Sequence, residues 1–379
     1  MARRDPTALP KVLLHDHLDG GLRPGTVLEL ATAAGYTALP ADAPDRLQAW
    51  FHQAGATSLE MYLAAFAHTF GVMQSPEAMR RVAFEALEDL AADGVVYAEL
   101  RFAPSLHTAA GMTRAQAIAG ALEGVRDGEA ATGVSARVIV DALRQHTDSV
   151  EVAGVAAEFA GRGVVGFDLA GPEANHPAHE HREAIAIARG AGLRVTIHAG
   201  EGDGVPSIAD ALDYAAERIG HGVRIIEDVT VRDGRIVAMG PVASEVHDRG
   251  IPLEVCPTSN LDTKMFSGPA DHPVGMLHRA GFVVTINTVI RVDLRLELGQ
   301  VTESVTVAGA VTLLQTDKSD VRSELPTAAM TNLPMGGYRN YQSLINLVPG
   351  TTPAAYQNAV VDTPARALTF NINGTNRNN

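Results

Sequence analysis

The chain has 379 residues, of which 46% are hydrophobic and 20% charged, a balance typical of one large α/β domain or two smaller ones. Its formal charge of −14 comes from residues 1–288, because residues 289–379 contain seven basic and seven acidic residues. An acidic chain without a basic stripe argues against a nucleic-acid partner, and no run reaches the roughly 18 apolar residues of a membrane helix. A single cysteine, Cys256, excludes an intramolecular disulfide, and we expect residues 1–288 to be cytoplasmic.

Short β-rich apolar runs alternate with alanine-rich helical patterns through residue 288. The predicted strands are Lys11–Leu14, Val95–Phe102, Ser135–Leu143, Val164–Leu169, Arg194–His198, Arg218–Gly220, Pro252–Cys256 and Phe282–Asn287. The predicted helices include Glu77–Ala92, Ala115–Ala131, His179–Ala191 and Ile208–Glu217. Strands that alternate with helices predict a parallel sheet, and eight strands are the number that closes a (β/α)8 TIM barrel. A doubly wound open sheet is the alternative.

Downstream of residue 288 the pattern changes. Apolar and charged residues alternate over Val292–Leu298, which predicts a half-exposed antiparallel strand, and Gly299-Gln300 can turn it into a second strand, Val301–Val307. From Asn332 onward Gly, Pro and Asn are dense, and the last residues are typical of disorder. The sequence therefore predicts a barrel truncated after its eighth strand, residues 1–288, and a β-rich, partly disordered appendage, residues 289–379.

All fourteen histidines precede residue 289, and four stand at predicted strand ends. His15 and His17, two residues apart, share one face of the first strand, while His198 and His221 end the fifth and sixth strands. In a barrel these side chains would converge at one mouth, where three neutral imidazoles with an open position make a catalytic zinc site. Zinc would lower the pKa of a bound water to about 7. Glu201 could then protonate a substrate ring nitrogen, and His221 could orient the attacking water or take its proton.

These residues stand in five motifs, which are His15-Asp-His-Leu-Asp-Gly20, Asp168-Leu-Ala-Gly171, His198-Ala-Gly-Glu201, Gly220-His-Gly222 and Cys256-Pro-Thr-Ser-Asn260. As a set they resemble the adenosine deaminase family of the amidohydrolase superfamily, over about residues 8–288. The resemblance implies hydrolytic deamination of adenosine or 2′-deoxyadenosine to inosine and ammonia. A single cysteine makes the cytidine-deaminase type of zinc site, with its paired cysteines, a poor fit.

The resemblance also implies roles for individual residues. His15, His17 and His198 would hold one zinc ion, Glu201 would donate a proton, and His221 would position the water on zinc. Three residues would contact a purine nucleoside, the expected small-molecule partner. They are Asp19 at the ribose 5′-hydroxyl, Gly171 at the purine, and His17. An Asp at position 19 is similar to the nucleoside-specific branch of the family.

The chain departs from the family pattern after its eighth strand. There the family continues Asn-Thr-Asp-Asp, in which the first Asp is a zinc ligand and the second contacts the purine. Here Asn287-Thr288 is followed by Val289-Ile290, so the Asp expected at 289 is absent. Asp293 stands four residues too far along to replace it. We therefore expect weak zinc binding and impaired turnover.

Residues 290–379 resemble a different family. The similar runs are Val301–Val307, Leu314–Asp317, Asn332–Pro334 and Arg339–Gly350. They look like TonB-dependent outer-membrane receptors, covering the end of a carboxypeptidase-regulatory-like domain and the start of the plug. Two alternatives to a deaminase follow: an outer-membrane transport or binding fragment, or a non-physiological fusion of two reading frames without enzymatic function. Because the two families belong to different compartments, the fusion is favoured for the intact chain.

Overall fold

The computed structural model describes residues 9–51, 66–286, 355–356 and 368–369. The chain divides into two compact units, Met1–Arg295 and Leu296–Asn379. The predicted junction at 288/289 and the expected strands over 292–307 lie outside the described residues, so both stay predictions. In the second unit the described elements are β11 (Ala355–Tyr356) and β12 (Leu368–Thr369), which pair antiparallel.

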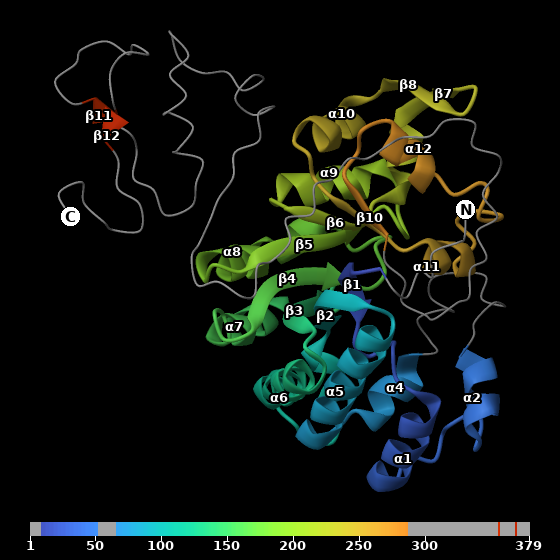
Figure 1. Ribbon diagram of the computed structural model, residues 1–379, viewed down its shortest axis with the longest axis vertical. Coiled ribbons are helices and arrows are strands. Elements are labelled where there is room, and N and C mark those ends of the chain that lie inside the picture. Colours follow the sequence, from blue (N-terminus) through green and yellow to red (C-terminus); the bar gives the residue numbers. More distant parts are fainter. Residues whose placement is uncertain (1–8, 52–65, 287–354, 357–367, 370–379) are drawn as a thin grey trace. The chain divides into compact units, whose positions relative to one another are not determined.

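Eight parallel strands form the sheet of the first unit, paired in the order β1-β2-β3-β4-β5-β6-β9-β10 (Figure 1). Their bounds are β1 Lys11–His17, β2 Val95–Phe102, β3 Ser135–Leu143, β4 Val164–Ala170, β5 Arg194–Ala199, β6 Arg218–His221, β9 Leu253–Val255 and β10 Val284–Ile286. This order follows the chain without the reversal that marks a doubly wound sheet. The sheet curves into a nearly closed barrel, although no pairing among the described residues joins β10 to β1. The TIM-barrel prediction is confirmed.

All eight predicted strands are present, and the largest differences are at their ends. β1 extends through His17 rather than ending at Leu14, and β9 and β10 are each three residues long. Burial explains why the central strands could be predicted from the sequence. In β3 every residue from Val138 to Leu143 is buried. Parallel strands covered on both faces appear in sequence as nearly continuous apolar runs.

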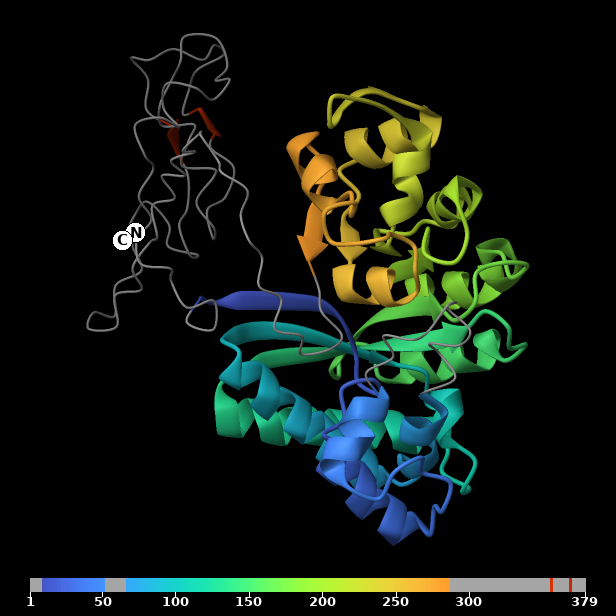
Figure 2. The same ribbon diagram turned by 90° about the vertical axis from the view of Figure 1, so that its right-hand side faces the viewer.

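Helices cover the outside of the barrel (Figure 2). Their bounds are α1 Pro24–Ala34, α2 Pro44–Phe51, α4 Phe66–Val72, α5 Pro76–Ala92, α6 Arg114–Thr132, α7 Ser149–Glu158, α8 Arg182–Gly190, α9 Val205–Asp213, α10 Pro241–Asp248, α11 Pro257–Asp262 and α12 Val274–Arg279. The short 3₁₀ helices are Pro104–His107, Ala178–His181 and Val223–Asp228. None of the described helices has the length and apolar character needed to cross a membrane.

Two of the four predicted helices, α5 and α6, begin where their sequences supply caps. Ser75 accepts a hydrogen bond from the backbone N–H of Ala78 at the start of α5, and Thr113 with Gln116 forms a capping box at the start of α6. The two helices then pack very closely: a Cβ atom on Gly124 would lie 2.0 Å from the carbonyl oxygen of Arg80. Only glycine permits that contact, so this residue sets the spacing between α5 and α6.

One hairpin was not predicted. Strands β7 (Val229–Arg232) and β8 (Arg235–Met239) pair antiparallel between β6 and α10. Their two-residue turn is Asp233-Gly234, with φ of 49° and 69°. An Asp-Gly pair between alternating residues is a strong hairpin signal, so this element was readable from the sequence.

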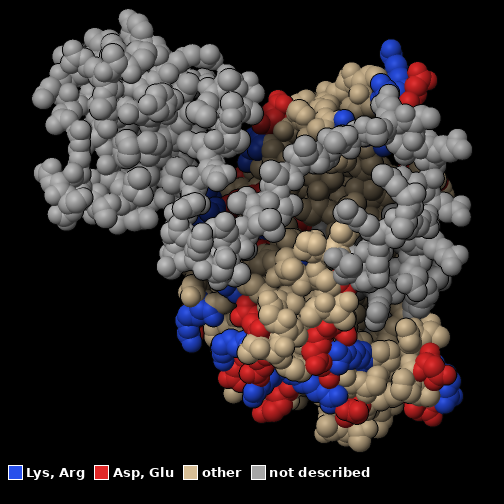
Figure 3. All heavy atoms as spheres, viewed as in Figure 1, with Lys and Arg blue, Asp and Glu red and all other residues tan. Residues whose placement is uncertain are grey.

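Acidic and basic side chains are interspersed on the described surface that Figure 3 shows around α5 and α6. Ion pairs tie these helices to their neighbours: the Arg80 guanidinium lies 2.6 Å from Asp127, and that of Arg81 lies 2.7 Å from Glu29. Arg80 and Arg81 are thus each paired with an acidic residue of a neighbouring helix.

Candidate active site

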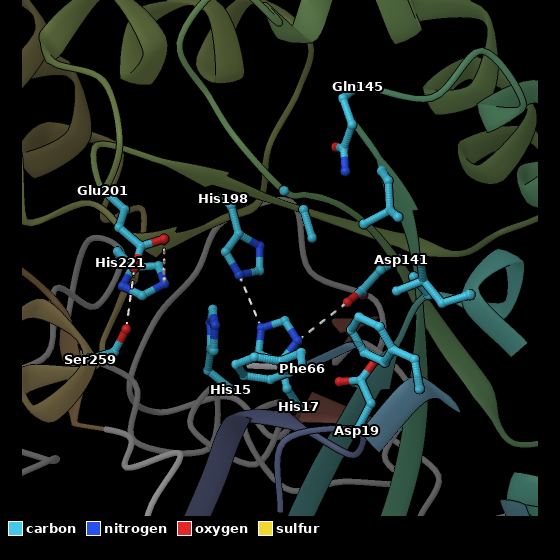
Figure 4. Close-up of a pocket in the computed structure, with 16 residues that line it drawn as sticks. His15, His17, Asp19, Phe66, Asp141, Gln145, His198, Glu201, His221 and Ser259 are labelled. Atoms are coloured by element: carbon cyan, nitrogen blue, oxygen red, sulfur yellow. Dashed lines mark hydrogen bonds and ion pairs between the residues drawn. The ribbon is translucent and has the colours of Figure 1, made fainter. Parts of the chain in front are cut away.

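Four histidine side chains converge at the carboxyl ends of three barrel strands (Figure 4). His15 and His17 come from β1, His198 from β5 and His221 from β6. From the ring of His15, the ring centroid of His17 is 5.1 Å away, that of His198 4.6 Å and that of His221 5.0 Å. The barrel therefore assembles the cluster that the strand ends predicted.

Two of these rings have a buried carboxylate beside their Nδ1 atoms. Glu254 Oε2 lies 3.0 Å from His15 Nδ1, and Asp168 Oδ2 lies 2.9 Å from His198 Nδ1. A carboxylate at Nδ1 favours the tautomer that carries its proton there. The Nε2 lone pairs are then left for another partner, as in histidines that bind metals.

The Nε2 atoms of His17 and His198 face each other at 3.2 Å. Asp141 Oδ2 lies on the other side of the His17 ring, 3.7 Å from Nδ1. Two Nε2 lone pairs at this separation repel unless a proton or a cation lies between them. Donor atoms of His15, His17 and His198 all lie within 4.8 Å of one another, and two nitrogens on one tetrahedral zinc ion lie ~3.3 Å apart. The donor set fits zinc.

Electrostatics keep the imidazoles of His15, His17 and His221 neutral. Burial lowers the pKa of these three rings well below the ordinary value, and the positive charge of Arg101 acts in the same direction. Neutral imidazole is the form that coordinates a metal ion, so the surroundings favour binding without proton release from these rings.

A buried arginine links the carboxylates under the histidines. Arg101, on β2, places Nη1 2.6 Å from Asp168 Oδ2 and Nη2 2.7 Å from Glu254 Oε2, while Arg218 Nε lies 2.8 Å from Glu254 Oε1. Burial alone would raise the pKa of Asp168, but the His198 ring, whose Nδ1 lies against this carboxylate, and the Arg101 guanidinium hold it below the ordinary value. The network holds both carboxylates in place against the rings of His15 and His198. The sequence prediction missed it, although charged residues inside apolar strands were a signal.

The loop after β5 is held by one buried carboxylate, that of Glu173. Its Oε1 accepts hydrogen bonds from the backbone N–H groups of Glu201 at 2.8 Å and Gly202 at 3.0 Å. Its Oε2 accepts from those of Gly200 at 2.8 Å and Asp203 at 3.3 Å. Four donors on one side chain fix the backbone that carries Glu201. Glu173 was not predicted, because nothing in the local sequence shows which loop it contacts.

The Glu201 carboxyl group lies against His221 and Ser259. Its Oε2 is 3.4 Å from His221 Nε2, and Ser259 Oγ donates to its Oε1 at 3.3 Å. Burial raises the pKa of Glu201 to about 7, and the negative charge of Glu173 acts in the same direction. A carboxyl group near half protonation at neutral pH is suited to general acid catalysis.

His221 has an unusual backbone. Its φ is 61°, in the left-handed region that residues with side chains rarely adopt, and Gly222 follows with φ of 65°. Conformations of this kind cost about 1–3 kcal/mol and are maintained by their surroundings. The turn after β6 thus holds the His221 ring against Glu201 despite the strain.

The cavity over the histidines combines polar groups with an apolar wall that includes Phe66, Phe70 and Leu106. Burial raises the pKa of Asp19, which lines this cavity, to about 7. Gly171 also lines it, with φ of 90°, and a Cβ atom there would lie 2.4 Å from Gln145 Oε1. The cavity brings together all seven predicted site residues, which are His15, His17, Asp19, Gly171, His198, Glu201 and His221.

The position of the missing aspartate lies outside the described residues. β10 ends at Ile286, and Asn287, Thr288, Val289 and Asp293 all follow it. Within the part that the structure describes, two sets of three side chains could hold a metal ion. One is His15, His17 and His198, which is the predicted zinc set, and the other is His15, His221 and Cys256.

A parallel barrel in sequential strand order, with clustered histidines at the carboxyl ends of its strands, defines a class: barrel enzymes of the amidohydrolase type. The family model described as adenosine deaminase matches residues 10–316. The chain belongs to the adenosine deaminase family. The match extends 28 residues past the predicted boundary at 288, and that boundary stays a prediction.

Individual relatives agree with this assignment. Adenosine deaminase of Mycobacterium leprae is 49% identical over 286 residues, covering 74% of this chain and 79% of the relative. That of Mycobacteroides abscessus is 50% identical over 289 residues, covering 74% and 80%.

Solved structures agree as well. An adenine deaminase from Arthrobacter aurescens has a TM-score of 0.65 at 28% identity, covering 73% of this chain and 81% of that one. A cog1816 amidohydrolase from Burkholderia ambifaria, solved with bound Zn, has a TM-score of 0.64 at 27% identity, covering 75% and 76%.

Proposed function

We propose that the first unit is a zinc-dependent deaminase that converts adenosine or 2′-deoxyadenosine to inosine and ammonia. The observation that carries the proposal is the set of three imidazole donors, His15, His17 and His198, with the carboxyl group of Glu201 beside them. Relatives about 50% identical that carry the name adenosine deaminase support this substrate over the adenine of the more distant structural neighbour.

His15, His17 and His198 would hold one zinc ion. The Nδ1 atoms of His15 and His198 face carboxylates, and donor atoms of all three histidines lie together, which supports this ligand set. The relative solved with bound Zn supports the choice of metal. Zinc bound there would supply hydroxide at neutral pH, since it lowers the pKa of water to about 7.

Glu201 holds the proton that the reaction needs at the purine. A pKa raised to about 7 leaves a large share of its carboxyl groups protonated at neutral pH. It would donate this proton to ring nitrogen N1 as hydroxide adds to C6. The proton of the new C6 hydroxyl group would then pass to the amino group, which leaves as ammonia as the C6 carbonyl of inosine forms. His221, 3.4 Å from Glu201, orients the attacking oxygen from the same side of the cavity.

Asp19, Gly171 and His17 bind the nucleoside. In this assignment Asp19 receives the 5′-hydroxyl, Gly171 contacts the purine, and His17 also approaches the substrate. All three line the same cavity as Phe66 and Phe70, which supports this assignment, because apolar rings offer a surface for the purine.

The same site is incomplete at Val289, where the family's fourth protein ligand is missing. Loss of a group that only supports a ligand commonly costs about 10–100-fold in metal affinity or activity, and loss of a direct ligand should cost at least as much. We therefore infer that the chain binds zinc weakly and turns over adenosine far more slowly than its relatives.

The test uses the purified full chain loaded with zinc. Conversion of adenosine to inosine is followed by absorbance, and zinc affinity by competition with a chelator, beside the Mycobacterium leprae relative. We expect slow turnover by the unaltered chain and no turnover by the Glu201→Gln variant. A second protein carries Val289→Asp and Ile290→Asp with the relative's C-terminal segment, and it should recover both properties. Fast turnover by the unaltered chain would contradict the impairment, and no recovery would contradict the site assignment.

Three predictions from the sequence remain untested. They are the resemblance of residues 290–379 to a TonB-dependent receptor fragment, the fusion of two reading frames, and the cytoplasmic location of residues 1–288. The idea that the 288/289 junction is an artefact would be contradicted if a peptide that spans Thr288–Val289 were detected in the producing cell.

A further inference from the structure

Asn260 closes the Cys256-Pro-Thr-Ser-Asn260 motif and has no role in the reaction described above. It lies on α11 and is fully buried behind the His221 ring. Its side-chain nitrogen is 3.0 Å from His221 Nδ1 and 3.4 Å from Met265 Sδ. Its side-chain oxygen is 3.3 Å from His272 Nε2. Asn260 therefore joins two buried histidines, one of which faces the catalytic cavity.

The backbone N–H group of Val274, which contacts His272, sets the direction of these hydrogen bonds. This N–H can only donate, and it lies 3.3 Å from His272 Nδ1, which must accept. Burial lowers the pKa of His272 to about 4, so this ring is neutral and carries its single proton on Nε2. The Nε2–H group then donates to the oxygen of Asn260.

The amide orientation of Asn260 follows from its partners. With its oxygen toward His272, its NH2 group points at His221 Nδ1 and Met265 Sδ. The thioether sulfur can only accept, so it favours the same orientation independently. The NH2 group can only donate, and His221 Nδ1 must therefore accept. A neutral His221 then carries its proton on Nε2, the atom that lies 3.4 Å from Glu201 Oε2.

We propose that Asn260 is a positioning residue that fixes His221 as the Nε2–H tautomer, through the hydrogen-bond sequence Val274–His272–Asn260–His221. In this tautomer His221 presents an N–H donor to the cavity rather than a lone pair. It orients the attacking oxygen by donating to it and does not take its proton. The sequence had left both roles open. The catalytic meaning of this inference rests on the proposed function, but the tautomer does not.

The tautomer is read directly by ¹⁵N NMR of the full, metal-free chain labelled at histidine, with the His221 signals assigned by their loss in His221→Gln. We expect Nε2 in the protonated range and Nδ1 in the unprotonated range. In Asn260→Asp the carboxylate can only accept, so the proton should move to Nδ1 and the two shifts should exchange. Asn175→Asp, at an exposed position, adds the same charge and should leave the His221 shifts unchanged.

A wild-type His221 protonated on Nδ1 would overturn the proposal, as would an unchanged tautomer in a folded Asn260→Asp protein. If Asn260→Asp does not fold, the wild-type spectrum alone decides between the two tautomers. The measurement needs no turnover. The tautomer result therefore holds even if the chain is not an active deaminase. Likewise, a wrong tautomer would not contradict the deaminase assignment.

Discussion

Glu173→Gln tests how the catalytic loop is held. The substitution keeps the size of the side chain and replaces one acceptor oxygen by an NH2 donor. Each carboxylate oxygen accepts two backbone N–H groups, so two N–H groups lose their acceptor whichever way the new amide turns. The NH2 group would also point at donors, which repel it.

The expected loss of stability follows from these four bonds. A buried donor left without an acceptor costs about 1–3 kcal/mol, so two such donors cost about 2–6 kcal/mol. Glu173 is only 3% exposed, so water cannot easily replace the lost acceptor. A typical domain has about 5–15 kcal/mol of stability in total, so the variant should be clearly destabilised.

Urea denaturation gives the free energy of unfolding, and hydrogen exchange followed by mass spectrometry reports on the amides of residues 200–203. We expect a lower free energy of unfolding and faster exchange in this loop than in the wild type. Glu180→Gln, which neutralises an exposed carboxylate seven residues away, should change neither. A loss below about 1 kcal/mol with unchanged exchange would refute the reasoning that Glu173 holds the loop.

Two further predictions follow from the charges of the site. Burial raises the pKa of Glu201 from 4.5 to about 7, so the folded state keeps this proton where the unfolded state has lost it, and stability falls as pH rises through 7. Relative to Glu201→Gln, the wild type should lose about 3 kcal/mol of unfolding free energy between pH 4 and 8, and parallel curves from urea titrations would contradict this. Asp168→Asn removes the carboxylate at His198 Nδ1 and should lower zinc affinity about 10–100-fold in chelator competition. Asp213→Asn, at an exposed position, serves as its control, and equal affinities would show that the carboxylate does not support the ligand.

Local sequence determined the strands, the barrel and the histidine cluster. Parallel strands buried on both faces need continuous apolar runs, so β2, β3 and β4 were recognisable by composition alone. Strand ends in a barrel share one mouth, so residues at those ends could be placed together without coordinates. The hairpin β7–β8 was missed even though its Asp-Gly turn is a local signal.

Tertiary structure alone decided which groups support the cluster and where their protons lie. Arg101 and Glu254 are 153 residues apart, and Glu173 contacts a loop 27 to 30 residues away, so no spacing rule connects them. The tautomer of His221 depends on Asn260 and His272, and through them on one backbone N–H of α12. A neutral histidine can carry its proton on either of two ring nitrogens. The donors and acceptors that the fold brings to each nitrogen decide which of the two carries it.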